Sequence, residues 1–502
     1  MNKKIHNKLF VAAGFTLACL PAARLAAQPA PAPAPKPNII LILMDDMGYG
    51  DIGSFGSKKN RTPNLDRMAA EGLRLTSFYA APLCTPSRAQ FMTGCYAKRV
   101  SLPNVIGPMS KIGISSKEHT VAELLKQQGY ATMAVGKWHL GDQPGFLPRK
   151  HGFDNYFGLP YSNDMDGGGT KKAQHPPLPL VRDDKPIEVI TPDGQDHLVE
   201  RYTDAVVKFI RERAPDSKNG KPFFLYFAHT AVHKPLHPGP NFKGKSANGD
   251  YGDWVEESDW SVGRVLDTLR ELGIANNTLV MFSSDNGPYQ LKPNMGGVAG
   301  PLRGAKRSTY EGGIRVATLA WWPGAIAPGS TTAALTGNID ILPTFVKLAG
   351  GAVPADNKID GVDISPILLG KAKESTRTVQ YYFSSNTLQA VRQGPWKLAI
   401  AKQNEATSAA TGTPHKYDPK FVPILYNLDT DIGERHDLAA QHPDIVKQLR
   451  ALAAAMDKDL GITGLGPGVR APGRVETPVG LWVPGYKPSK ETLAAHYDTD
   501  EE

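Results

Sequence analysis

From residue 38 onward, continuous apolar runs alternate with amphipathic stretches along the chain. Residues 38–46 read NIILILMDD, an unbroken apolar run that ends in two acids and is typical of a parallel strand buried on both faces. Similar runs occupy residues 130–138, 221–229 and 277–287. Because amphipathic stretches separate these runs, the pattern predicts an α/β fold with a mostly parallel sheet covered by helices on both faces.

Local signals place the starts of several helices. Thr62 and Pro63 suit the cap and the first turn of one helix. Thr120 and Glu123 form a capping box at the start of the helix expected at residues 119–129. Further helices are predicted around residues 202–213 and 253–273.

The sequence pattern changes near residue 375, where short strand-like runs joined by turns replace the alternation of long apolar runs and amphipathic stretches. These runs cover residues 378–385, 389–401 and 423–429, and a helical stretch follows at residues 442–457. We predict a smaller C-terminal α+β subdomain with an antiparallel sheet. The tail beyond it is rich in Gly, Pro and charge, and we expect it to wrap the surface.

The N-terminus has the features of an export signal. It combines a basic start, an apolar run of about ten residues and small residues near an expected cleavage site. That run is too short to span a bilayer. Lipidation at Cys19 is the alternative, but the residues before it fit a lipoprotein box poorly. No later segment approaches twenty apolar residues, so we expect an exported, periplasmic or secreted protein without a transmembrane segment.

These observations predict the organisation of the whole chain. The expected parts are a signal peptide (1–27), a Pro/Ala linker (28–37), a catalytic domain (38–375), a C-terminal subdomain (376–465) and a tail (466–502).

Composition narrows the function only slightly. Of 502 residues, 41% are hydrophobic and 21% are charged, which is ordinary for a globular protein and argues against disorder. Loss of residues 1–27 would remove four basic residues and no acidic one, so the formal charge would fall from +8 to +4. No basic cluster with interleaved aromatic residues is present, so we do not expect nucleic-acid binding.

Only two cysteines, Cys84 and Cys95, remain after the expected cleavage. In an oxidising compartment they could form a disulfide across a short loop. Alternatively, each is a small buried hydrophobic residue.

Two strand ends carry hard oxygen ligands. The run at 38–46 ends in Asp45 and Asp46, and the run at 277–287 ends in Asp285 and Asn286. Ligands bind beyond the carboxyl ends of the strands in an open parallel sheet. Three carboxylates and one amide suit calcium or magnesium and not zinc or copper. The plainer interpretation of either pair alone is that it starts a turn.

Two other strand ends carry cationic and proton-transferring groups. Lys137 and His139 are two residues apart, so their side chains point to one face if the strand continues. His229 and His233 follow another strand. A lone histidine is more often structural, but these groups beside a metal suggest anion binding and proton transfer to a leaving group.

Cys84 lies where a helix is expected to begin. Thr85 suits its cap, Pro86 its first residue and Gly94 its end. The free N–H groups at such a helix start favour anions, and Arg88 lies one turn further on. This surrounding predicts an activated nucleophile.

At these residues the chain resembles the type I sulfatase family, whose signature is Cys-x-Pro-x-Arg followed by a short run ending in Thr-Gly. Further blocks that resemble the family are DDMGYGDIG from Asp45, TPNLDRMAAEG from Thr62, GKWHLG from Gly136, SDNG from Ser284 and GAKRSTYEGGIRV from Gly304. The resemblance, which is arylsulfatase A-like, runs from about residue 38 to residue 457. It implies an alkaline-phosphatase-like fold and hydrolysis of sulfate monoesters.

The resemblance also implies a mechanism. Cys84 would be oxidised to formylglycine by a maturation enzyme, and the hydrated aldehyde would be the nucleophile. Calcium, with magnesium the less favoured ion, would be bound by Asp45, Asp46, Asp285, Asn286 and the formylglycine at position 84. The remaining roles would fall to Arg88 (holding the hydrate), Lys137 and Lys306 (neutralising sulfate), His139 (hydrate proton transfer), His233 (protonating the departing alcohol) and Ser162 (near the sulfate).

The substrate and two rival functions stay open at this stage. The expected export and the substrates usual in the family favour a sulfated carbohydrate or glycan, with activity on aryl sulfates. We expect the residues that determine specificity in segments 161–197 and 234–251 and in the C-terminal subdomain. One rival is a phosphate or phosphonate ester hydrolase of the same superfamily. The other is an inactive relative that binds sulfated glycans, which the complete set of expected residues disfavours.

Overall fold

The computed structural model describes residues 36–166, 176–292, 295–404 and 417–487, together with positions 1, 8, 9 and 12. Cys19, nearly all of the predicted signal peptide, the linker up to residue 35 and the tail from residue 488 lie outside the described residues. Residues 36–502 belong to one compact unit. The predicted boundaries at residues 375 and 465 stay predictions.

A large mixed sheet forms the centre of this unit. Its strand order is β13-β2-β12-β9-β1-β8-β4-β5-β6-β7, and β14 pairs with β2. The strands are β1 (Asn38–Met44), β2 (Leu73–Tyr79), β4 (Ala131–Gly136), β5 (Asn155–Gly158), β6 (Pro179–Arg182), β7 (Lys185–Val189), β8 (Phe223–Ala228), β9 (Thr278–Ser284), β12 (Arg315–Trp321), β13 (Ser330–Thr332) and β14 (Thr336–Gly337).

The middle of the sheet is parallel, as predicted. Strands β9, β1, β8, β4 and β5 all run in one direction. β12 is antiparallel to both of its neighbours, β9 and β2, and the sequence pattern did not predict this reversal. An apolar run such as RVATLAW predicts burial on both faces but carries no information on strand direction.

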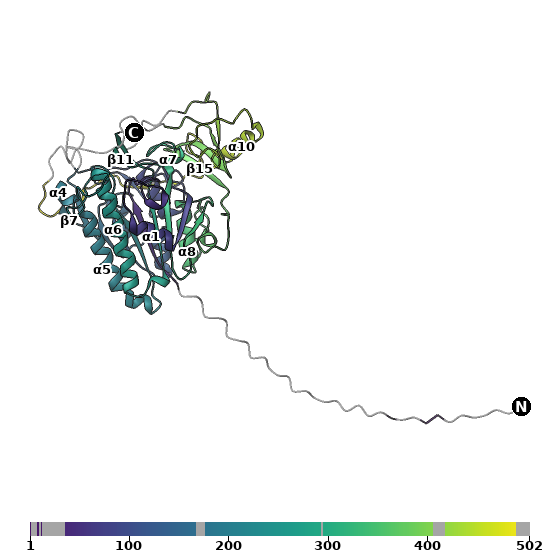
Figure 1. Cartoon of the computed structure of the whole chain (residues 1–502), viewed down its shortest axis with the longest axis horizontal. Coiled ribbons are helices and arrows are strands. Elements are labelled where there is room, and N and C mark those ends of the chain that lie inside the picture. Colours follow the sequence, from purple (N-terminus) through teal and green to yellow (C-terminus); the bar gives the residue numbers. More distant parts are fainter. Residues whose placement is uncertain are drawn as a thin grey trace. The chain divides into compact units, whose positions relative to one another are not determined.

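Helices cover both faces of the sheet, because alternate residues of each strand point to opposite sides. Ile40 and Ile42 face the layer of α1 (Pro63–Glu71), α5 (Leu198–Lys218) and α6 (Gly249–Glu271). Ile39 and Leu41 face the layer of α2 (Cys84–Thr93), α3 (Val121–Gln127) and α8 (Ile341–Leu348). Figure 1 shows α5 and α6 side by side along one side of the sheet and α8 on the other. The predicted α/β sandwich is confirmed.

The helix ends agree in part with the predictions. The capping box of Thr120 and Glu123 is present at the start of α3. α1 begins at Pro63, but Thr62 does not cap it with its side chain. The Thr62 hydroxyl instead accepts the N–H of Gly53 at 2.8 Å. A tertiary contact thus takes the place of the predicted local one.

The predicted C-terminal antiparallel sheet is confirmed. It consists of β15 (Val379–Ser384), β16 (Thr387–Gln393), β17 (Trp396–Ala399) and β18 (Ile424–Asn427) in that order. Helix α10 (Pro443–Asp459) packs on it through Leu449, Ala453 and Met456. In Figure 1, β15 lies beside α7 (Glu311–Ile314), and Ile314 of α7 packs with Tyr382 of β15.

The remaining elements are short. They are β3 (Ile112–Gly113), β10 (Gln290–Lys292), β11 (Met295–Gly296), β19 (Gly473–Arg474), α4 (Pro192–Gln195), α9 (Ser365–Leu368) and the three-ten turns Gly53–Phe55, Pro144–Phe146, Pro148–His151, Ala275–Asn277 and Asn338–Asp340. The described part of the tail pairs β19 with β3. Within the described ranges, no helix has both the length and the apolar character needed to cross a membrane.

Candidate active site

The acidic ends of β1 and β9 meet at the carboxyl edge of the sheet. The two strands pair in parallel up to Met44 and Ser284, so the residues that follow emerge together. The N–H of Asp46 donates to Asp285 Oδ1 at 3.2 Å, and Asn286 Nδ2 donates to Asp46 Oδ1 at 2.7 Å. The four predicted ligand side chains that this brings together, all fully buried, are Asp45, Asp46, Asp285 and Asn286.

Cys84 is the first residue of α2, which begins two positions earlier than predicted. Leu83 occupies the cap position, so the prediction that Thr85 caps this helix is wrong. The Thr85 hydroxyl donates instead to the backbone carbonyl of His139 at 3.0 Å. The helix ends, as predicted, at Gly94, which has a φ of 68°.

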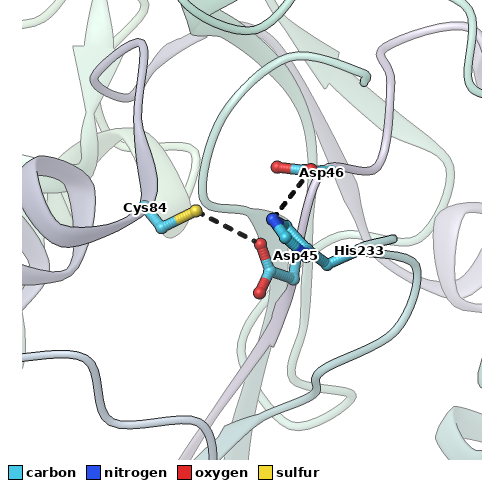
Figure 2. Close-up of side chains that lie close together, drawn as sticks. All are labelled: Asp45, Asp46, Cys84 and His233. Carbon is cyan, nitrogen blue, oxygen red and sulfur yellow. Dashed lines mark hydrogen bonds and ion pairs between the residues drawn. The ribbon is translucent and has the colours of Figure 1, made fainter. Parts of the chain in front are cut away.

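The Cys84 thiol lies between an acid and an amine. Its Sγ is 3.5 Å from Asp45 Oδ1 and 3.2 Å from Lys306 Nζ, and Figure 2 shows it pointing toward Asp45. Only 2% of the residue is exposed. Burial, together with the negative charge of Asp45, raises the pKa of this thiol. Desolvation therefore outweighs the helix start and the nearby lysines, so the thiol itself is not activated, and the nucleophile at position 84 stays a prediction.

Arg88 joins the two acidic strand ends. Its Nη2 lies 2.9 Å from Asp285 Oδ2 and 3.5 Å from Asp45 Oδ2, and its Nη1 donates to the carbonyl of Lys137 at 2.7 Å. The side chain is fully buried. A buried guanidinium with several acceptors holds them in fixed geometry.

Two lysines complete the buried centre. Lys137 Nζ lies 2.5 Å from Asp45 Oδ2 and donates to Ser162 Oγ at 3.1 Å. Lys306 Nζ lies 2.6 Å from Asp46 Oδ1. Both ammonium groups therefore face the region around Cys84 from different loops.

The carboxyl groups of this centre differ in acidity. Burial acts to raise the pKa of Asp45, but the positive charges of Lys137, His233 and Arg88 outweigh it and hold this pKa well below its usual range. Burial and the neighbouring charge of Asp45 raise the pKa of Asp285 to about 7. Three carboxylates packed this closely repel one another unless cations intervene.

The donor atoms fit a hard divalent cation. Asp46 Oδ2 and Asn286 Oδ1 are buried and have no hydrogen-bond partner among the described residues. One ligand atom from each of Asp45, Asp46, Cys84 and His233 lies within 4.8 Å of the others (Figure 2). Unpaired buried oxygen acceptors are costly unless a cation or donor satisfies them. His233 was not predicted as part of this cluster.

His233 and Ser162 lie next to the acidic and cationic side chains around Cys84. His233 Nε2 lies 3.7 Å from Asp46 Oδ2, and its Nδ1 contacts the carbonyl of Lys234 at 2.6 Å. Ser162 Oγ is 3.5 Å from His233 Nδ1. The sequence analysis did not single out Asp164. Its Oδ1 is buried and has no hydrogen-bond partner among the described residues, and its Oδ2 lies 3.8 Å from Lys234 Nζ.

The two remaining histidines lie differently from the prediction. β4 ends at Gly136, which has a φ of 99°, and His139 has a φ of 61°, so the strand does not continue and alternation does not govern Lys137 and His139. His139 is buried, its Nε2 contacts the carbonyl of Ile106 at 2.9 Å and its Nδ1 has no partner within the described structure. His229 is buried, and its ring is tilted against that of Phe227 with the ring centroids 4.1 Å apart. Burial lowers its pKa to about 3.

Cys95 is a free, buried thiol. No disulfide joins it to Cys84, so the disulfide alternative is excluded. Its Sγ accepts a hydrogen bond from Arg470 Nη2 at 3.3 Å and lies 3.4 Å from the carbonyl of Thr93. Burial raises its pKa, as expected for a structural cysteine.

Comparison with known proteins identifies this arrangement. Residues 37–352 match the family model described as "Sulfatase", and residues 375–464 match "C-terminal region of aryl-sulfatase". The chain belongs to the sulfatase family. The resemblance read from the sequence is therefore confirmed, and the chain is a sulfuric ester hydrolase of this family.

Relatives of this sulfatase cover most of its length. It is 38% identical to arylsulfatase A of Bos taurus over 477 residues, which span 88% of this chain and 91% of the relative. It is 37% identical to N-acetylgalactosamine-6-sulfatase of Canis lupus familiaris over 482 residues, which span 88% of this chain and 90% of the relative. The solved PsFucS1 sulfatase from Pseudoalteromonas sp. has a TM-score of 0.75 and 31% identity and covers 86% of this chain and 92% of its own.

Proposed function

We propose that this sulfatase is exported and hydrolyses sulfate monoesters of saccharides by means of a formylglycine at position 84 and a bound calcium ion, with magnesium as the second choice. The observation that carries the proposal is the position of Cys84, whose side chain lies between Lys306 and the acidic ends of β1 and β9. In the mature enzyme Cys84 Sγ would stand in for an oxygen of the formylglycine hydrate.

Two cationic side chains would bind the sulfate. Lys137 Nζ and Lys306 Nζ approach the centre from different loops, and Ser162 Oγ is hydrogen-bonded to Lys137. Ammonium groups in a water-poor site stabilise the charge that develops as the S–O bond of the ester breaks. Arg88 would hold the carboxylates of Asp45 and Asp285 in place through its two ion pairs.

Calcium would be held by Asp45, Asp46, Asp285 and Asn286, and the buried unpaired oxygens of Asp46 and Asn286 support this assignment. When present, the formylglycine hydrate would supply the nucleophilic oxygen and the ion would supply additional positive charge.

Histidines would carry the protons. His233 Nε2 faces the acidic centre and would protonate the departing alcohol oxygen. The Nδ1 of His139 is buried without a partner among the described residues, which leaves it available for proton exchange near position 84.

The saccharide substrate and the export rest on weaker support. A relative that covers most of this chain is named for a sulfated amino sugar, N-acetylgalactosamine 6-sulfate. The N-terminal sequence supports export to the periplasm or beyond. Cys84 and Arg88 are both buried, so a maturation enzyme would have to modify the signature before the chain folds.

The deciding experiment combines mass spectrometry with turnover. Natively matured protein should carry formylglycine at position 84 and should cleave nitrophenyl sulfate far faster than nitrophenyl phosphate. A panel of defined sulfated saccharides should include at least one that is desulfated. An unmodified thiol in fully active protein, or a preference for the phosphate ester, would contradict the proposal.

A further inference from the structure

The loop that carries Lys306 is held largely by the C-terminal sheet. It spans residues 303–310 and connects the active site to the beginning of α7 at Glu311. Lys306 reaches both Cys84 and Asp46 from this loop. Backbone hydrogen bonds also join it to the catalytic part: the N–H of Lys306 donates to the carbonyl of Pro288 at 3.0 Å, and the N–H of Arg307 donates to the carbonyl of Pro82 at 2.8 Å.

Thr309 is the main contact between this loop and the C-terminal sheet. Its hydroxyl donates to Gln389 Oε1 at 2.6 Å and accepts from Gln403 Nε2 at 3.1 Å. Its carbonyl accepts from Lys397 Nζ at 2.8 Å. Gln389 lies on β16 and Lys397 on β17, so two strands of the C-terminal sheet fix this one residue.

Neighbouring residues of the loop are fixed in the same way. Ser308 Oγ donates to the carbonyl of Asn404 at 2.6 Å, and Asn404 Nδ2 donates to the carbonyl of Arg307 at 3.3 Å. Arg307 has a φ of 74°, a conformation that a non-glycine residue adopts only when its surroundings impose it. The loop shape between Lys306 and Thr309 therefore depends on these outside contacts.

A buried ion cluster anchors the far end of the loop. Lys397 Nζ lies 2.7 Å from Glu434 Oε1 and 3.1 Å from Glu311 Oε1, and all three side chains are fully buried. The N–H of Glu311 donates to Glu434 Oε2 at 2.7 Å. Charges held this tightly leave the loop little freedom to shift.

We infer that the C-terminal sheet is a positioning element of the active site: through Thr309 it sets where Lys306 meets the sulfate group. The inference rests on the proposed role of Lys306 in sulfate binding. Thr309 touches no reacting atom, so it acts through Lys306. A displacement of about 1 Å in a charge-stabilising group can reduce a rate by about 100-fold.

A double-mutant cycle tests this coupling. Thr309→Val keeps the side-chain shape but removes the hydroxyl that contacts Gln389 and Gln403. We expect it to lower kcat/KM for nitrophenyl sulfate by about 10- to 100-fold in the presence of Lys306, and to add little to the loss in a Lys306→Ala background. Thr309→Ser should restore most of the activity. Gln389→Met removes the oxygen that accepts the hydrogen bond of the Thr309 hydroxyl, so it should lower kcat/KM as Thr309→Val does.

Thr344→Val is the matched control. Thr344 is buried in α8, and its hydroxyl accepts the N–H of Ile364 at 2.9 Å, away from the Lys306 loop. This variant loses one buried hydrogen bond, where Thr309→Val loses two, so it should also lower thermal stability but without the loss in kcat/KM. Equal losses in Thr309→Val and Thr344→Val would overturn the inference.

Measuring the affinity for inorganic sulfate tests the positioning role of Thr309 independently of sulfatase activity. Calorimetric affinities of wild type, Thr309→Val, Lys306→Ala and the double variant need no turnover. Non-additive losses of affinity would support the positioning role even if the protein cleaved no sulfate ester. Additive losses, or an unchanged affinity in Thr309→Val, would refute the positioning role while leaving sulfatase activity unaffected.

Discussion

Replacement of Lys397 by Met should destabilise the protein strongly at neutral or higher pH. The ammonium group lies between Glu434 Oε1 at 2.7 Å and Glu311 Oε1 at 3.1 Å, and no part of its side chain is exposed. The variant would leave two buried carboxylates without their shared cation. Removal of one partner from a buried ion pair typically costs about 3–5 kcal/mol of unfolding free energy.

The loss should depend on pH in a defined direction. Burial raises the pKa of Glu434 to about 7. Burial also acts to raise the pKa of Glu311, but the positive charges of Lys397 and the nearby arginines outweigh it and lower the pKa of Glu311 to about 2. Without Lys397 both pKa values should rise. The folded variant would then bind more protons than the unfolded chain, so its stability would fall as the pH increases. The difference from wild type should therefore be larger at pH 8 than at pH 5.5.

Urea unfolding followed by fluorescence measures this difference. Glu434→Gln combined with Lys397→Met should recover part of the loss, because it removes one of the two unpaired charges. Lys347→Met is the control, since Lys347 is an exposed residue of α8 and should change stability by less than about 0.5 kcal/mol. A loss below about 1 kcal/mol for Lys397→Met, or no recovery in the double variant, would refute the reasoning.

Three further predictions concern catalysis, specificity and pH. His233→Ala should reduce kcat by about 100- to 10,000-fold for a saccharide sulfate but far less for nitrophenyl sulfate, because nitrophenolate leaves without a proton; equal losses measured on both substrates would contradict the assigned role. Asp164→Asn should lower kcat/KM for saccharides bearing free hydroxyl groups and spare nitrophenyl sulfate, since its buried Oδ1 has no partner among the described residues. Burial raises the pKa of Glu257 to about 8, so the wild type should lose stability as the pH rises from about 4.5 to 8. Glu257→Gln removes this charge, so its gain in unfolding free energy over wild type, measured by urea titration, should increase over the same pH range.

The parts of the fold that were predicted correctly depend on local patterns. NIILILM is buried at every position and forms the strand that its apolar run predicts. The acids that follow this strand and β9 meet because parallel strands deliver their carboxyl ends to one edge. The capping box at Thr120 likewise involves only neighbours in sequence.

The errors arose where distant parts of the chain decide the outcome. The depth of Cys84 depends on packing around α2, which local polarity does not encode, and this burial reverses the expected shift of its thiol pKa. The positive φ of Gly136 ends β4 before Lys137 and removes the alternation expected there. Lys397 lies in a strand, as predicted, but its buried contacts with Thr309 and Glu311 were not predicted, because these partners lie more than eighty positions away in the sequence.

The charges of the centre link metal binding to sulfate binding. Lys137 pairs with Asp45, Lys306 with Asp46, and Arg88 with both Asp285 and Asp45, so every one of these cations already has a buried carboxylate partner. If the two lysines bind the sulfate as proposed, a sulfate ester would have to compete with these carboxylates for them. A divalent cation bound to the same carboxylates would weaken that competition, so calcium should raise the affinity for inorganic sulfate by about 10-fold or more, and sulfate should raise the affinity for calcium by the same factor. Calorimetric titrations in both orders measure the two factors, and equal sulfate affinities with and without calcium would show that the carboxylates and the sulfate do not share these lysines.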